Sequence, residues 1–340
     1  MLRLPRFDLR QPTSLGEAVT LLREEGAGAM VMAGGTDLLP NMKHELFTPR
    51  VVVSLGRVPE LRGITRDPDG TLVVGAMARI AEIASSESVR KQAPALAQAA
   101  GLVAGPQLRR AGTIGGNVLL DTRCQYYNQS YFWRSALGFC LKKDGVVCHV
   151  VAGGSRCVAA ASADCAPALM TLGAVLEIVG ANGHRTVSID EFWLGDGIVN
   201  RRLAVGEILV AIRIPPTPPG HRGAYGKLRE RGSIDFPLLG VACRLDVGDG
   251  DRVEHGDLVL TALAARPKRI PQAASRLVST RLGTEEFRAA VDELGALAHR
   301  QCHTLANVPG DQEWRREMIP VYVRRTLQAA AAGNGPVHHV

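Results

Sequence analysis

The chain has few aromatic residues and no long hydrophobic run. Phe, Trp and Tyr make up 4% of its 340 residues, and no apolar stretch approaches the roughly 20 residues that a membrane-spanning helix needs. Residues 1–8 lack the apolar stretch and the small-residue cleavage site of a signal peptide. We therefore expect a cytoplasmic protein without a membrane span. Its hydrophobic content of 46% still suffices for the cores of two or three domains.

Several motifs of independent catalysis are also missing. The sequence has no H-E-x-x-H motif, no G-x-G-x-x-G fingerprint, and no recognisable Ser–His–Asp set or pair of acid–base carboxylates. The net charge is +7, but Lys and Arg are scattered rather than concentrated in a nucleic-acid-binding stripe. We expect no nucleic-acid partner. The densest basic cluster is expected to be a solvated helix face, and it consists of Arg315, Arg316, Arg324 and Arg325.

The order of the expected elements indicates an α+β fold of mixed α/β character. Ser14 and Glu17 form a capping-box pattern that opens a helix through about Arg23. Short apolar runs predict strands near 29–32, 51–53, 72–75, 175–178, 208–214, 242–247 and 258–263. Helices are expected from Leu38 and near 78–84, 93–100, 167–172, 285–298 and 315–331. The proline-rich segment 215–220 predicts a linker between a domain at 1–219 and a smaller α+β domain at 220–333.

Two glycine-rich segments are candidates for binding a dinucleotide. Residues 33–37 follow an expected strand and precede a helix, and residues 113–117 form a second glycine loop. Glycine pairs leave backbone N–H groups free to turn toward a phosphate, and the start of a helix adds partial positive charge. One such loop more often marks an ordinary tight turn. Two loops could grip a dinucleotide from both sides, although the missing G-x-G-x-x-G fingerprint argues against a standard nicotinamide-binding domain.

Four of the seven cysteines lie in one segment. Cys124, Cys140, Cys148 and Cys157 are spaced C-x15-C-x7-C-x8-C. The same segment concentrates aromatic residues suited to sheltering a buried group, namely Tyr126, Tyr127, Tyr131, Phe132, Trp133 and Phe139. Four thiolates hold either zinc or an iron–sulfur cluster, and the spacing alone leaves both open, together with four unliganded buried thiols. The separate Cys165, Cys243 and Cys302 are expected to be packing residues.

Longer motifs resemble a known family. Residues 33–38 and 113–117 are similar to the paired flavin motifs of the xanthine dehydrogenase and carbon monoxide dehydrogenase flavoproteins. Further matches extend the resemblance over nearly the whole chain, and they are residues 163–167, 172–174, 207–209 and 214–215, with Lys227, Arg231 and Asp235. The resemblance implies an FAD-binding domain in two lobes, about 1–56 and 57–219, with an iron–sulfur insertion at about 121–160.

The same resemblance implies which residues contact FAD. The first loop contributes Val31, Met32, Ala33, Gly34, Gly35, Thr36, Asp37 and Leu38, and the second contributes Thr113, Ile114, Gly115, Gly116 and Asn117. Val103 matches a position near the flavin ring. Asp164, Leu209 and Lys227 match other contacting positions. Asp164 could instead be a helix N-cap, and Lys227 could be an exposed strand lysine.

The cysteine segment resembles the insertion in the flavin subunits of 4-hydroxybenzoyl-CoA reductases. The matching stretches are residues 121–124, 127–130, 133–134, 140–142, 148–150 and 156–157. This resemblance implies a [4Fe–4S] cluster on the four cysteines. It also implies a large molybdenum-cofactor subunit, a small [2Fe–2S] subunit and a ferredoxin-type donor. Electrons would then pass through the cluster and FAD toward molybdenum for reductive dehydroxylation of 4-hydroxybenzoyl-CoA to benzoyl-CoA, leaving no catalytic residue on this chain.

Two other functions remain open from the sequence. The chain could be the FAD subunit of a conventional molybdenum hydroxylase, in which electrons leave the substrate. It could also be a zinc-stabilised interaction module without enzymatic activity. The cysteine insertion argues against the first, and the paired glycine loops argue against the second.

Overall fold

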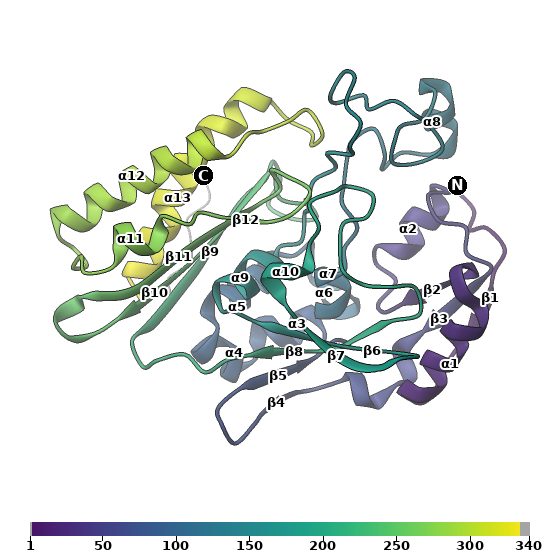
Figure 1. Cartoon of the computed structure of the whole chain (residues 1–340), viewed down its shortest axis with the longest axis horizontal. Helices are drawn as coiled ribbons and strands as arrows, with labels where there is room; N and C mark the ends of the chain where they lie inside the picture. Colours follow the sequence, from purple (N-terminus) through teal and green to yellow (C-terminus); the bar gives the residue numbers. More distant parts are fainter. Residues whose placement is uncertain (1, 334–340) are drawn as a thin grey trace.

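The computed structural model describes residues 2–333 and contains three β-sheets (Figure 1). The first lobe is a three-stranded parallel sheet in the order β1-β3-β2. Its elements are β1 (Asp8–Arg10), α1 (Leu15–Glu25), β2 (Ala29–Met32), α2 (Leu38–Lys43) and β3 (Val51–Ser54). The expected cap of α1 is confirmed, because the Ser14 hydroxyl accepts from the Glu17 amide at 3.2 Å. The Glu17 carboxylate accepts in turn from the Thr13 amide at 2.7 Å.

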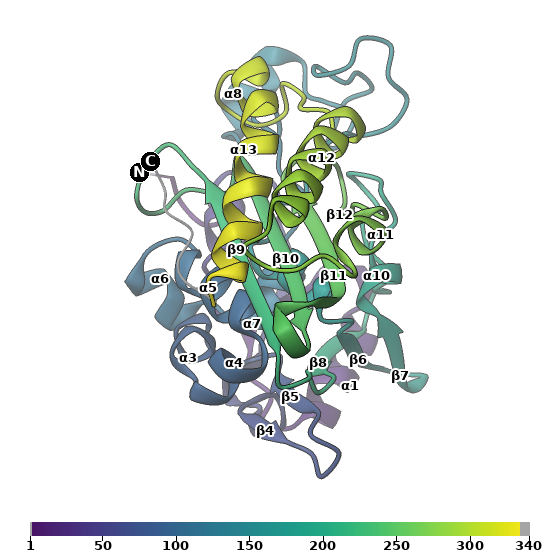
Figure 2. The same ribbon diagram turned by 90° about the vertical axis from the view of Figure 1, so that its left-hand side faces the viewer.

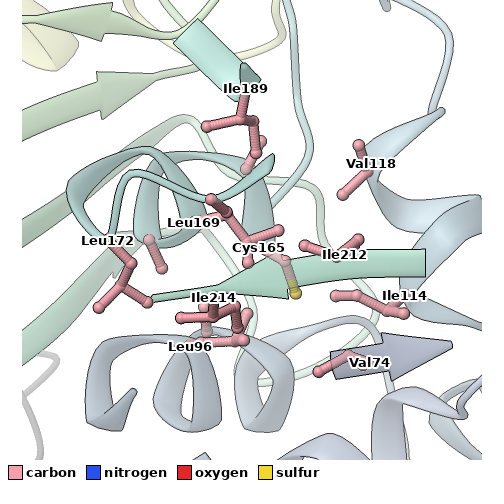
Figure 3. Packing of buried hydrophobic residues seen from close by; sticks show 14 of the residues in the cluster. Val74, Leu96, Ile114, Val118, Cys165, Leu169, Leu172, Ile189, Ile212 and Ile214 are labelled. Carbon is pink, nitrogen blue, oxygen red and sulfur yellow. The ribbon is translucent and has the colours of Figure 1, made fainter. Parts of the chain in front are cut away.

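The second lobe is built on a five-stranded antiparallel sheet in the order β4-β5-β8-β6-β7. Its strands are β4 (Ile64–Arg66), β5 (Leu72–Gly75), β6 (Val175–Gly180), β7 (Gly183–Ser188) and β8 (Ile208–Ile214). The helices around it are α3 (Ile80–Ser85), α4 (Glu87–Gln92), α5 (Pro94–Leu102), α6 (Pro106–Ala111), α7 (Ile114–Val118), α9 (Cys165–Thr171) and α10 (Ile189–Phe192). Figure 3 shows Cys165 and Leu169 of α9 packed against Ile212 of β8 in the largest apolar core.

The third sheet has the order β12-β11-β10-β9 and is antiparallel. Its strands are β9 (His221–Leu228), β10 (Leu239–Val247), β11 (Val253–Thr261) and β12 (Lys268–Arg269). The helices α11 (Ala273–Leu277), α12 (Glu285–Gln301) and α13 (Gln312–Ala331) lie on this sheet (Figure 2). Four 3-10 turns complete the described elements, η1 (Gly26–Gly28), η2 (Leu55–Arg57), η3 (Pro59–Leu61) and η4 (Asp249–Asp251).

The cysteine-containing segment leaves the second lobe and returns to the same place. Arg123 and Ala160 form an antiparallel bridge with N–H···O distances of 2.8 and 2.7 Å. Between them the chain forms α8 (Tyr131–Leu137) and irregular loops, which extend beyond α2 in Figure 1. The buried Arg134 guanidinium donates to the carbonyls of His44 and Glu45 at 3.2 and 3.1 Å. The segment is therefore anchored at its base and also against the end of α2.

The mixed α/β fold is confirmed, but several local expectations were wrong. Residues 113–117 are not a loop, because Thr113 caps the short helix α7. The predicted solvated basic face includes Arg315, which is fully buried and donates to the carbonyls of Leu238, Ala262 and Leu305. Burial lowers the pKa of this guanidinium to about 10. The linker joins β8 to β9 and stays a predicted domain boundary. No helix within residues 2–333 has the length and apolarity to cross a membrane.

Candidate functional site

A cleft of about 560 Å³ lies where the first two lobes meet. The first glycine loop, the start of α7 and the strand β8 contribute to its wall. Residues 234–236, in the loop between β9 and β10 of the third sheet, also line the cleft. The loop before α9 adds Asp164, and the base of the cysteine insertion adds Asp121 and Arg123. The cleft therefore gathers residues from the first two lobes, the base of the insertion and the loop before β10.

The first glycine loop has a backbone that only glycine allows at two adjacent positions. A Cβ atom on Gly34 would overlap the carbonyl oxygen of Ala111 at the end of α6. Gly35 has a φ of +71°, in the left-handed region that favours glycine. The amides of Gly34, Gly35 and Thr36 donate to no acceptor within the described chain. These N–H groups are thus available to a phosphate at the start of α2.

The second glycine segment differs from the first because its amides already have partners. The Thr113 hydroxyl accepts from the Gly116 amide at 3.1 Å. The amides of Ile114 and Gly115 donate to the carbonyls of Ala78 and Ala76, each at 2.9 Å. A Cβ on Gly115 would lie 2.7 Å from the Ala76 oxygen, whereas one on Gly116 would meet only the Thr113 hydroxyl, at 3.2 Å. This segment therefore supplies close packing and a surface without side chains rather than free amides.

Most of the residues implied by the family resemblance lie in the wall of the cleft. Three do not, and they are Met32, Ile114 and Lys227. Val103 follows α5 and lies in the wall, so an aliphatic side chain occupies this position. Leu209 of β8 lies in the wall as well.

Asp164 and Lys227 form a buried pair, so the suggested exposed position of Lys227 was wrong. Asp164 does occupy the N-cap position of α9, as the alternative suggested, but its side chain makes no cap hydrogen bond. Instead it accepts from the Lys227 ammonium at 3.0 Å and from the Tyr225 hydroxyl at 2.8 Å. Lys227 is fully buried and also donates to the Leu102 carbonyl at 3.0 Å. Burial raises the pKa of Asp164, and the charge of Lys227 opposes that rise. Lys227 thus acts on the cleft through Asp164.

Sequence reasoning missed a group of charged side chains in the cleft. Arg123 lies 3.4 Å from Asp37, and its guanidinium stacks 3.8 Å from the centre of the Phe236 ring. Arg201 donates to the Leu119 carbonyl, and burial lowers the pKa of its guanidinium. Burial also raises the pKa of Asp37, although Arg123 opposes the rise. In the sequence, Arg123 could be singled out only because it directly precedes Cys124. Nothing in the sequence connects Arg201 with this group, because it lies far from Arg123 along the chain.

The four clustered cysteines come together in the insertion. Cys140 and Cys157 are buried, and Cys124 and Cys148 are partly buried. Cys140 and Cys124 pack with Tyr127 against Leu46 of the first lobe. Burial raises the pKa of the Cys124 thiol to about 11, and nearby Cys157 and Cys140 add to this rise. Burial also raises the pKa of Cys157. The described residues contain no group of three or more Cys, His, Asp or Glu side chains arranged as a single-ion site.

The remaining cysteines are buried away from this group. Cys165 lies in the largest apolar core, and Cys243 and Cys302 both lie in the second. His149 lies beside Cys148, and its Nε2 is within hydrogen-bonding distance of the Phe139 carbonyl. Its ring also packs on Tyr126, with ring centres 5.4 Å apart.

Comparisons with known proteins identify the family of the chain. The model of the FAD binding domain in molybdopterin dehydrogenase matches residues 5–217. The model of the CO dehydrogenase flavoprotein C-terminal domain matches residues 224–330. The carbon monoxide dehydrogenase medium chain of Hydrogenophaga pseudoflava is 33% identical, over 96% of this chain and 98% of that protein. The xanthine dehydrogenase FAD-binding subunit of Escherichia coli O157:H7 is 29% identical, over 95% of each chain.

The folds agree as well. The Hydrogenophaga pseudoflava carbon monoxide dehydrogenase that lacks the Mo-pyranopterin moiety superposes with a TM-score of 0.78 and 31% identity. The match covers 97% of this chain and 99% of that one. The fold and the cleft thus define an FAD-binding oxidoreductase subunit. The chain belongs to the FAD-binding subunits of the xanthine dehydrogenase and carbon monoxide dehydrogenase family, the molybdenum-hydroxylase flavoproteins.

Proposed function

We propose that this chain is the electron-transfer subunit of a heteromeric molybdenum enzyme and holds both FAD and a [4Fe–4S] cluster. The observation that carries the proposal is the convergence of four thiols in an insertion whose base forms part of the cleft wall. The names of the relatives, a medium chain of carbon monoxide dehydrogenase and an FAD-binding subunit of xanthine dehydrogenase, support a subunit role. The expected partners are a large molybdenum-cofactor subunit and a small [2Fe–2S] subunit.

The residues around the cleft fit FAD. The free amides of the first glycine loop would donate to the pyrophosphate. Gly116 of α7 has no side chain and would leave room for the cofactor against that helix. Arg123 and Arg201 would offset phosphate charge. Val103 would pack near the flavin ring without aromatic stacking. When bound, FAD supplies chemistry that links one-electron and two-electron carriers. The protein's own task is to orient it and to exclude water.

The insertion fits a group bound through thiolates alone. Its donors are four cysteines without a disulfide. The Lys142 ammonium, with a side chain only 5% exposed, lies close enough to Cys157 to act on its thiol. This positive charge opposes the effect of burial on the pKa of Cys157. A zinc ion needs sulfurs at about 2.3 Å from one centre. A four-iron cluster is larger and needs four thiolates around a wider centre. We favour the cluster because of the resemblance of the insertion, and it would supply one-electron chemistry when bound.

The substrate assignment rests on the resemblance of the insertion. In the proposed reaction, 4-hydroxybenzoyl-CoA takes up two electrons and two protons, loses its phenolic oxygen as water, and becomes benzoyl-CoA. A ferredoxin-type donor would supply the electrons. The reaction would occur on the molybdenum subunit, so this chain needs no acid or base of its own.

A conventional hydroxylase is the second candidate function. The relatives include carbon monoxide, xanthine and aldehyde oxidoreductase subunits, whose names indicate oxidative enzymes. In such an enzyme, electrons would leave the substrate through FAD to an acceptor. Membership of an FAD-binding family argues against a zinc-stabilised module without enzymatic activity.

Isolation of the natural complex under anaerobic conditions separates the two candidates. We expect the chain to copurify with a molybdenum subunit and a [2Fe–2S] subunit. With a reduced low-potential ferredoxin, the complex should convert 4-hydroxybenzoyl-CoA to benzoyl-CoA. Activity only in the oxidative direction, with an artificial acceptor and another substrate, would favour the conventional hydroxylase. A chain that always purifies alone as an active oxidoreductase would refute the subunit role.

A further inference from the structure

Lys142 is a buried lysine in the middle of the cysteine insertion. Its ammonium donates to the Asp121 carboxylate at 2.9 Å, the Thr122 carbonyl at 3.0 Å and the Gly197 carbonyl at 2.7 Å. It also donates to the Thr122 hydroxyl and lies 4.6 Å from the centre of the Tyr127 ring. A buried ammonium is costly unless it is fully paired. The surroundings of Lys142 meet this requirement through several acceptors and an aromatic face.

The adjacent lysine shows that this arrangement is particular to Lys142. The Lys143 side chain is 38% exposed, and its partner is Asp144, at 3.4 Å. An exposed pair of this kind contributes little to stability. The two neighbouring lysines can thus be compared directly, because only the Lys142 side chain is buried.

On one side, Lys142 holds the segment through which the insertion returns to the second lobe. Gly197 donates its amide to the Cys157 carbonyl at 3.0 Å, and its own carbonyl accepts from Lys142 and from the Thr122 hydroxyl. A Cβ on Gly197 would come within 2.5 Å of the Cys157 sulfur. Lys142 therefore fixes the segment that carries Cys157 against the segment that carries Cys140.

On the other side, Lys142 contacts the wall of the FAD cleft. Asp121, its carboxylate partner, lines that cleft together with Arg123, Arg201 and Asp37. The charge of Asp121 acts on both arginines. Positively and negatively charged side chains thus alternate from the insertion to the first glycine loop, in the order Lys142, Asp121, Arg123 and Asp37. A ligand that orders the cleft wall would also order the partner of Lys142.

We propose that Lys142 is a positioning residue that couples FAD binding in the cleft to the order of the cysteine insertion. The coupling to FAD rests on the proposed FAD site but not on the presence of a cluster. By linkage, an insertion ordered through Lys142 must also favour FAD binding. Residues 125–134 have anchors that do not involve Lys142. Gln125 donates to the carbonyls of Ala306 and Asn307 at 2.6 and 2.8 Å, and Arg134 donates to the end of α2, although Arg134 also pairs with Asp144 at 3.4 Å.

Hydrogen exchange of the full-length chain, freed of flavin and iron, tests this coupling. Adding FAD to the wild type should slow exchange at residues 140–157. In Lys142→Met this FAD-dependent protection should be lost, and the dissociation constant for FAD should rise about 5- to 150-fold, the usual range for coupled sites. Lys143→Met should behave as the wild type does. Lys142→Arg, which keeps the charge, should restore part of the effect.

The FAD-dependent protection at residues 125–134 provides an internal control, because Arg134 should preserve it in Lys142→Met. Equal protection of residues 140–157 in Lys142→Met and Lys143→Met would overturn the proposal. If Lys142→Met does not fold, Lys142→Gln provides the same comparison, with circular dichroism as the check of folding. A wild-type chain that binds no FAD would refute the proposed FAD site instead, so the two failures are distinguishable.

Discussion

Individual glycines in the cleft have different physical roles that the sequence pattern does not separate. Gly34 allows the first loop to touch the backbone of Ala111, and Gly115 allows α7 to approach Ala76. Gly35 meets a requirement for positive φ. Gly116 alone faces open space beyond the Thr113 hydroxyl. The motif predicts that glycine is needed, but only the packed backbone reveals the reason at each position.

Substitutions at Gly116 and Gly34 should therefore fail in different ways. Gly116→Val should fold but lose most of its FAD, because the new side chain enters the cleft. Gly34→Ala should lower the free energy of unfolding by about 1–3 kcal/mol or more, because its Cβ overlaps a backbone carbonyl. Thermal unfolding and the flavin absorbance per chain measure the two effects.

Gly16 in α1 provides the matched control, because a Cβ there meets nothing within 4 Å. Gly16→Ala should keep full FAD and gain up to about 1 kcal/mol of stability. Full, tightly bound FAD in Gly116→Val would show that α7 does not border the flavin.

Buried charges are the residues that sequence reasoning placed least well. Lys227 and Arg315 are both fully buried, although each was compatible with an exposed position. Asp164, the partner of Lys227, and two of the three carbonyls that accept from Arg315, those of Leu238 and Ala262, are distant in sequence. A sequence pattern records that a residue is charged, but the acceptors that allow its burial exist only after folding.

At the scale of elements, strands with continuous apolar runs were predictable and polar strands were not. β3, β5 and β8 are apolar and were expected near their observed positions. β7 is mostly exposed, and β9 contains Gly223 and Gly226, so neither shows a clear alternation. The cysteine insertion has no periodic pattern at all. Its two ends are joined by the bridge between Arg123 and Ala160, which no local sequence pattern predicts.

The pairing of β9 with β10 predicts a specific dependence of stability on pH. Asp246 faces His221 across these strands, at 2.8 Å, and also pairs with Arg244. These partners lower the pKa of Asp246 to about 2, although burial opposes them. Since the folded pKa lies below the unfolded value, this carboxylate stabilises the protein above about pH 4. That contribution, roughly 2 kcal/mol, should be lost as the pH falls through 2.

Urea unfolding of Asp246→Asn between pH 5 and pH 2 measures this contribution. The variant should be less stable than the wild type at pH 5, and the gap should shrink by roughly 2 kcal/mol toward pH 2. Asp249→Asn is the control, because Asp249 lies on the exposed turn after β10. A gap that stays constant over this range would contradict the assignment of the ion pair.

At the scale of the whole molecule, the family and its mixed fold could be predicted from motifs distributed along the chain. The charged lining of the cleft could not, because its members come from separate elements that meet only in three dimensions. Of the third sheet, only β10 and β11 were expected near their observed positions, and the contribution of residues 234–236 to the cleft was not foreseen. The insertion extends from this assembly beside α2, as Figure 1 shows.

The cofactor content of the full-length chain, purified without oxygen, tests the central claim most directly. We predict one FAD, about four irons and about four sulfides per chain. Cys148→Ser should lose the iron while keeping FAD, and Cys302→Ala should keep both, because Cys302 is a buried member of the apolar core of the C-terminal helices. Stoichiometric zinc without sulfide, or iron that is lost in Cys302→Ala but retained in Cys148→Ser, would contradict the account.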